Sequence, residues 1–405
     1  MDAAARLEVI EQLFFSDRRQ AMEKLSEFVD AAKGRDRAAA MKALVARVDH
    51  EHPGLAAYLA LAGGAIVEDG EEANALGRAI VAPLERSLIA AARMLVHVAD
   101  LPDAEVEEEE DDEDGGDDHD HDHDHDHDHD HQHNGNGHAH AHEEEEHVMI
   151  GTKAVNKDIL DAIADEDLVA VQAWFSLDIW YRPAVATWTR ETDVLREVQL
   201  SGRLRDSLAK LGSTTETSHW LSLLIETVFD APFVLLFPEL DEAWQLTATG
   251  VVDMGQLSAL ISPPLRDPLA RIGLEEQPDD EVLAVMRGDG PQQGEGTYSC
   301  GFHCYPIEAT DPESGMPRDD VHTWSAPGGT GTHSLPPDFL PGSLAPVDGA
   351  RVLLVVGPRS PGMRFVRSMP AVRTFDGLMA RVSSATKLSP ADTKKWFDAA
   401  KQHAE

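Results

Sequence analysis

The chain has 405 residues, of which 42% are hydrophobic and 27% are charged, and its formal net charge is −40 at pH 7. This composition excludes a collagen, a coiled-coil rod and a wholly disordered protein, and the negative charge disfavours binding to nucleic acid or to an anionic membrane. Two cysteines are too few for a disulfide framework, so we expect a reducing, cytoplasmic compartment.

Residues 1–102 repeat apolar side chains at helical spacing. The series is Leu7, Ile10, Leu13 and Phe14, then Met22, Leu25, Phe28 and Val29, then Met41, Leu44, Val45 and Val48. Ser16–Asp17 predicts the N-cap of a second helix, and residues 34–36 predict a break before a third. Two further helices are expected at 53–67 and 71–99. We predict an all-α domain, either a small bundle or a short HEAT-like stack.

Residues 103–147, the His/Asp segment, hold 22 acidic residues and 12 histidines but no Lys or Arg. Their apolar surface is too small to offset chain entropy, and their like charges repel, so we predict a disordered linker between two parts that need not touch. Neutral imidazole binds zinc, nickel and copper, and the acids attract divalent cations. The predicted metal ligands are His119, His121, His123, His125, His127, His129, His131, His133, His138, His140 and His142.

Without a fixed geometry, these imidazoles would hold a divalent transition metal loosely, as a buffer and not as a catalytic centre. Two other interpretations of the segment stay open. It is either a low-complexity spacer that provides solubility and separation, or a pH-responsive segment whose histidines become cationic and offset part of the acidic charge.

The helical pattern resumes in residues 148–231, where it begins near Lys153 and is rich in aromatic residues that we expect to fill a core. The aromatic residues are Trp174, Phe175, Trp180, Tyr181 and Trp188. Residues 232–405 predict an α+β region, with strands at Phe233–Phe237 and Arg351–Gly357. Its last helix is expected to start after a Ser389 cap, with Pro390 in the first turn, and to dock through Trp396 and Phe397.

Both cysteines lie in YSCGFHCYPI, as Cys300 and Cys304, with His303 between them and His322 and His333 further along. Thiolate and imidazole are zinc ligands, so Cys300, His303 and Cys304 are weaker metal candidates. A straight strand over 297–307 would instead hold the two sulfurs about 13 Å apart, at ~3.3 Å per residue, as buried apolar groups. A turn at Gly301 would let them converge.

Other candidates have plainer interpretations. His50 and His52, two residues apart, fit the end of a helix better than a chelating pair. The glycine-rich stretches 288–296 and 328–331 fit loops, because neither joins a clear strand to a helix. Trp174, Trp180 and Trp188 could line a peptide groove, although core packing is the expected role. No phosphate-binding loop, HExxH or GxSxG motif is present.

Taken together, the sequence predicts a mainly helical cytoplasmic protein that works as a protein-interaction or adaptor module. Its His/Asp segment is expected to bind divalent transition metal, and its partner is expected to be a protein, not nucleic acid or a membrane. The alternative is a metal- or thiol-dependent enzyme whose site lies near Cys300, His303, Cys304, His322 and His333.

Overall fold

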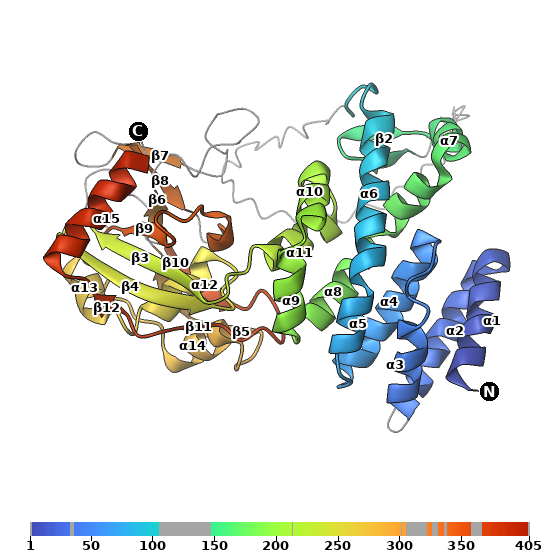
Figure 1. Cartoon of the computed structure of the whole chain (residues 1–405), viewed down its shortest axis with the longest axis horizontal. Helices are drawn as coiled ribbons and strands as arrows, with labels where there is room; N and C mark the ends of the chain where they lie inside the picture. The colour runs from blue at the N-terminus through green and yellow to red at the C-terminus, as the bar shows by residue number, and fades with distance from the viewer. Residues whose placement is uncertain are drawn as a thin grey trace, which may run out of the picture.

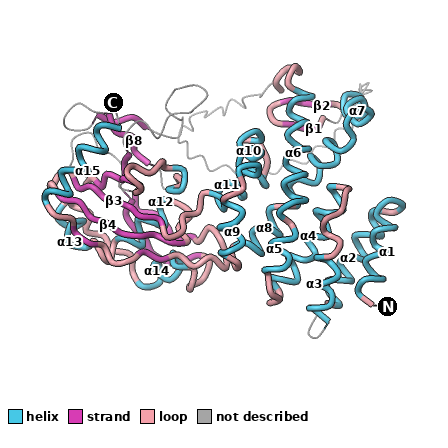
Figure 2. Tube along the Cα trace, viewed as in Figure 1, coloured by secondary structure: helices cyan, strands magenta, loops and turns pink. Residues whose placement is uncertain are grey.

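The computed structural model describes residues 2–32, 36–104, 147–212, 214–300, 302–304, 322–325, 331–335, 338–357 and 367–403. The fold is mainly helical, as the sequence predicts. Helices occupy the part of the molecule that contains the N-terminus, and most strands gather at the opposite end (Figure 1, Figure 2). Within the described ranges, no helix is both long and apolar enough to cross a lipid bilayer.

Six helices precede the His/Asp segment: α1 (Ala3–Ser16), α2 (Arg18–Ala31), α3 (Arg37–Val45), α4 (Pro53–Glu68), α5 (Asn74–Ala79) and α6 (Val81–Val98). Asp17 caps α2 as predicted, because its carboxylate accepts the Gln20 backbone N–H at 3.0 Å. The single helix expected at 71–99 is wrong, since it divides into α5 and α6. Pro83 lies in the first turn of α6, where a missing backbone N–H is tolerated.

A hairpin, β1 (Val148–Ile150) with β2 (Lys153–Val155), stands where the sequence predicted that a helix begins near Lys153. Gly151 takes a positive φ of +62° in its two-residue turn, a conformation that glycine adopts without strain. The helices follow as α7 (Lys157–Ser176), α8 (Tyr181–Trp188), α9 (Thr192–Gln199), α10 (Gly202–Leu211) and α11 (Glu216–Ile225), with a short 3₁₀ helix, η2 (Leu177–Ile179), between α7 and α8.

The helices before and after the His/Asp segment share one hydrophobic core. Buried residues from Leu7 to Ala91 form one continuous cluster with buried residues from Ala173 to Ile225. Trp188 on α8 is fully buried, and its indole N–H donates to the Gly77 carbonyl of α5 at 2.9 Å. The expectation that the parts flanking the segment need not touch is therefore wrong, because their buried residues pack together in one cluster.

The aromatic residues are divided between core and surface. Trp180 and Trp188 are fully buried, as predicted. Phe175 is 50% exposed, because the buried face of α7 consists of small residues such as Ala170 and Ala173, and Phe175 lies off that face.

The α+β region contains β3 (Ala231–Phe237), β4 (Glu242–Thr249), α12 (Met254–Ile261), α13 (Arg266–Arg271), α14 (Asp280–Arg287), β5 (Gln293–Cys300), β6 (Phe302–Cys304), β7 (His322–Ser325), β8 (Gly331–Leu335), η4 (Pro341–Ser343), β9 (Arg351–Val355), β10 (Arg367–Val372), β11 (Arg381–Val382), β12 (Thr386–Lys387) and α15 (Pro390–His403). The main sheet has the order β11–β4–β3–β9–β6–β8–β7, with β12 also paired to β4. Its β3–β9 pair is parallel, and β5 pairs with β10 in a separate sheet.

Helices cover both faces of the main sheet. Phe233 and Leu235 of β3 pack into the core formed with α12 and α14, whereas Val234 and Leu236 face the cluster that contains Ala400 of α15. Burial on both faces explains why β3 is continuously apolar. The sequence prediction for α15 is confirmed. The Ser389 hydroxyl accepts the Asp392 N–H at 3.2 Å, and Trp396 and Phe397 pack against the sheet.

Candidate functional site

The two ends of the His/Asp segment meet at the β1–β2 hairpin. The Ala104 N–H donates to the Thr152 carbonyl at 2.9 Å, and Asp103 forms an antiparallel bridge with Lys153. Lys153 Nζ lies 2.8 Å from Asp103 Oδ1, and the Thr152 hydroxyl donates to the same carboxylate. These two partners, Lys153 first, lower the pKa of Asp103. The chain between residues 104 and 147 therefore leaves and re-enters the protein at one hairpin.

That hairpin rests on α6 and α7. Met94 and Val98 of α6, Ile150 and Val155 of the hairpin, and Ala170 of α7 belong to one buried cluster. This cluster attaches the base of the segment to the helical core without relying on its polar contacts alone.

An ion pair crosses from α6 to α7 beside this cluster. Asp167 interrupts α7 with φ −142° and ψ 69°, and its carboxylate accepts the Ala170 N–H at 3.1 Å, as an N-cap does. Arg93 Nε and Nη2 donate to the two carboxylate oxygens at 2.6 and 3.0 Å, and His97 Nε2 lies 3.7 Å away. Arg93 holds the pKa of Asp167 at about 2. This pair fixes the kink of α7 against α6.

The predicted metal-ligating histidines, from His119 to His142, lie outside the described residues. Their role as ligands stays a prediction that rests on the chemistry of imidazole. Among the residues that the structure does describe, no group of three or more His, Cys, Asp or Glu side chains is placed to hold a metal ion.

The cysteine region departs from the expectation of one straight strand. Strand β5 ends at Cys300, which pairs with Arg367 in one sheet, whereas β6 begins at Phe302 in the main sheet. The two cysteine positions thus belong to different sheets. The expectation of one straight strand over 297–307 is therefore wrong, because the backbone changes sheet between β5 and β6.

The strand register distributes the other candidate positions over two faces of the main sheet. Cys304 pairs with His333, while His303 and His322 each pair with Ser334. Paired positions share a face and successive positions alternate, so Cys304 and His333 fall on one face and His303 and His322 on the other. The backbone does not gather the predicted Cys and His set at one point.

His50 and His52 act as acceptors at the start of α4. The His52 N–H donates to His50 Nδ1 at 2.9 Å, and the Leu55 N–H donates to His52 Nδ1 at 3.3 Å. An Nδ1 that accepts a hydrogen bond leaves the ring proton on Nε2, so neither ring can bind a metal ion without changing this arrangement. The capping interpretation of these residues is therefore confirmed.

The glycine-rich stretch at 288–296 serves packing. Gly288 ends α14 with φ +88°, and a Cβ on Gly294 would lie 2.9 Å from Val285 Cγ2. Gly290 is likewise held against Ala284. These glycines let the start of β5 approach α14. The loop prediction is correct for Gly288 and Gly290 but wrong for Gly294 and Gly296, which lie in β5. Gly328 and Gly329 lie outside the described residues.

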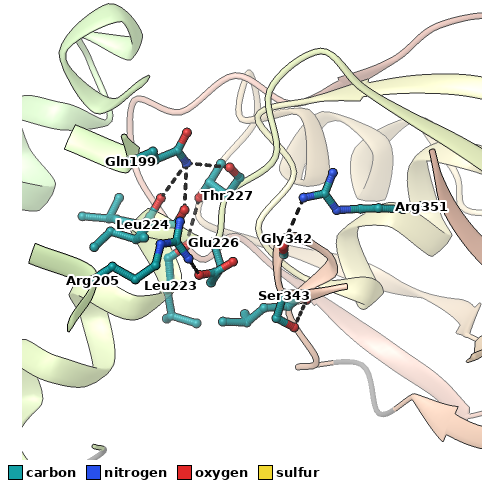
Figure 3. Close-up of polar contacts among 11 residues, drawn as sticks. Gln199, Arg205, Leu223, Leu224, Glu226, Thr227, Gly342, Ser343 and Arg351 are labelled. Carbon is teal, nitrogen blue, oxygen red and sulfur yellow. Dashed lines mark hydrogen bonds and ion pairs between the residues drawn. The ribbon is translucent and has the colours of Figure 1, made fainter. Parts of the chain in front are cut away.

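Polar contacts at the seam between the helices and the α+β region were not predicted from the sequence (Figure 3). Gln199 Nε2 donates to the carbonyls of Leu224, Ile225 and Thr227 at 3.3, 3.0 and 2.6 Å, and so ties α9 to the end of α11. Arg205 on α10 pairs with Glu226 immediately after α11.

On the α+β side of the seam, Gly342 packs against the backbone of Glu226. A Cβ on Gly342 would lie 1.8 Å from the Glu226 carbonyl oxygen, so only glycine allows this approach. The Gly342 carbonyl accepts a hydrogen bond from Arg351 Nη2 at 3.1 Å (Figure 3). The close backbone contact at Gly342 and the hydrogen bond from Arg351 together link the end of α11 to β9.

Two pockets lie at this boundary. One, of about 570 Å³, is lined by α10, α11 and residues 338–343, with Leu223 and Phe339 among its apolar walls. The other, of about 480 Å³, contains Tyr181 stacked on Trp220 at 6.2 Å and Phe375 at 5.8 Å from Trp220. Each has the size of a small-molecule pocket, but its lining mixes charges of both signs and indicates no particular ligand. Because their residues come from distant segments, sequence spacing could not reveal them.

Comparisons of the chain with protein-family models, with curated proteins and with solved structures found no match.

Proposed function

We propose that this protein is a cytoplasmic adaptor that carries divalent transition metal on its His/Asp segment. The observation that supports this proposal most directly is the closure of the segment at Asp103–Lys153 and Ala104–Thr152. On this proposal, both ends of the metal-carrying segment are held beside α6 and α7, whichever imidazoles bind the ion. The imidazole and carboxylate groups suit zinc, nickel or copper.

The metal half of the proposal is tested on the full chain by isothermal titration with Ni²⁺ at pH 7.5. The variant replaces the eleven histidines from His119 to His142 with Gln and keeps the acidic residues. We expect heat of binding in the wild type and none in the variant. Retention of one tightly bound ion by the variant would contradict the proposal, because it would place the metal on other ligands, such as Cys304 and His333.

The adaptor half rests on apolar side chains that α6 and α7 leave in solvent. Val96 is 76% exposed on α6, and Leu168 and Phe175 are 53% and 50% exposed on α7. Clusters of exposed apolar side chains are typical of protein-binding sites, and this proposal takes these three as members of one such cluster. The adjacent segment adds 22 acidic residues. A basic protein with an apolar contact face fits both features by charge and by burial.

Two variants test this surface in a quantitative pull-down from the native host. We expect Val96→Lys and Phe175→Lys to lower recovery of a basic protein at least several-fold. Leu200→Lys is the matched control, because Leu200, immediately after α9, is 87% exposed and lies outside the two helices of the proposed surface. Equal recovery by all three variants would contradict a partner site on α6 and α7.

A further inference from the structure

The start of α4 is held by two histidines in series. His50 Nδ1 accepts the N–H of His52, and His52 Nδ1 accepts the N–H of Leu55. The Leu55 N–H belongs to the first helical turn, whose backbone donors have no acceptor within the helix. A protonated imidazole carries hydrogen on both nitrogens and cannot accept either bond. Protonation of His52 therefore removes the bond that caps the first turn of α4.

This entry lies at the contact of three helices. The His52 ring meets the rings of Phe14 and Phe15 on α1 edge-on, at 5.2 and 5.4 Å. Arg18 on α2 stands 5.4 Å from the centres of both the Phe14 and Tyr58 rings. Loss of the His52 position would thus disturb the packing of the first two helices on α4, where twelve of the sixteen residues are buried.

The net effect of the surroundings is to disfavour a proton on His52. Burial is the largest cause of its lowered pKa, the neighbouring His50 and the Arg18 guanidinium act in the same direction, and a backbone hydrogen bond partly opposes them. The Tyr58 ring faces the site, while the carboxylate of Asp49 is paired with Arg86. Glu51 follows His50 in the chain. A cation at this helix start also opposes the helix dipole.

We propose that His52, with its ring next to His50, forms an acid-sensitive latch that helps to hold α1 and α2 on the start of α4 at neutral pH and weakens this contact on mild acidification. The direction in which stability changes with pH follows from the linkage between proton binding and folding. Because the folded state lowers the pKa of His52 below its usual 6.5, the unfolded state binds the proton more readily. The stabilisation is complete above that value and declines as pH falls through it.

The test compares the unfolding of the full chain in urea at pH 7.5 and pH 5.5. Over this range, the unfolding constant of the wild type should rise by up to about tenfold more than that of His52→Asn, whose amide caps the helix without titrating. His219→Asn is the control, because His219 is exposed on α11, and it should keep the wild-type pH response. Equal pH responses for the wild type and His52→Asn would overturn the latch.

Hydrogen exchange in the wild type keeps the proposal testable even if the variant fails to fold. After correction for intrinsic rates, peptides that cover residues 50–58 should lose protection at pH 5.5 well before peptides from α6 do. Uniform protection across both regions at the two pH values would overturn the proposal.

Discussion

Trp188 provides the sharpest test of the single helical core. Its indole N–H donates to Gly77 across 111 positions of the chain, and the ring is fully buried between helices on either side of the His/Asp segment. Trp188→Phe leaves the Gly77 carbonyl without its partner, which costs about 1–3 kcal/mol, and the smaller ring leaves a cavity that costs about 1–2 kcal/mol more. We therefore expect the free energy of unfolding to fall by about 2–5 kcal/mol.

Trp220→Phe is the matched control. Trp220 is only partly buried, and its indole N–H donates to the exposed carboxylate of Glu216 within the same helix, at 2.9 Å. Water can replace that acceptor, so the expected loss is under about 1 kcal/mol. The measurement is urea unfolding followed by circular dichroism, with the slope of the transition compared between variants. Equal midpoints for the two variants would refute a shared core sealed by Trp188.

Two further predictions concern the α6–α7 ion pair and the seam. The wild type should lose stability as pH falls from about 4 toward 2, because Arg93 lowers the pKa of Asp167 to about 2. Arg93→Gln should remove much of this loss of stability at acidic pH. Urea unfolding measured along a pH series tests the prediction. Gly342→Ala should lower the melting temperature strongly, since its Cβ would collide with the Glu226 carbonyl, whereas Gly202→Ala, with nothing within 4 Å, should leave it nearly unchanged.

The elements that the sequence predicts correctly are those whose capping residues and apolar patterns lie within the element itself. The apolar run at β3 and the Ser389 and Pro390 signals of α15 need no distant residue to be interpreted. Asp17 likewise caps α2 through a contact only three residues away. Capping and periodicity act within one or two turns, which is why such elements can be predicted from a single chain.

The contacts that sequence reasoning missed join residues far apart in the chain. Gln199 reaches carbonyls 25 to 28 positions away, and Gly342 lies against Glu226 through backbone shape alone. The contact between the two parts that flank the His/Asp segment was not predicted, for the same reason. A highly charged segment interrupts the hydrophobic pattern, but the pattern cannot show whether the flanking helices pack together.

The predicted mode of metal binding to the His/Asp segment also determines how metal should change the stability of the folded protein. A ligand stabilises a fold only to the extent that it prefers the folded state. Imidazoles that ligate in shifting combinations, as the sequence predicts, bind equally well when the helices are unfolded. We therefore expect Ni²⁺ at saturating concentration to shift the melting temperature by less than about 1 °C, in contrast to the several degrees that a site preorganised by the fold would give. A rise of several degrees that survives replacement of the segment's histidines would move the metal to a folded site, for which Cys304 and His333, paired across β6 and β8, are the first positions to replace.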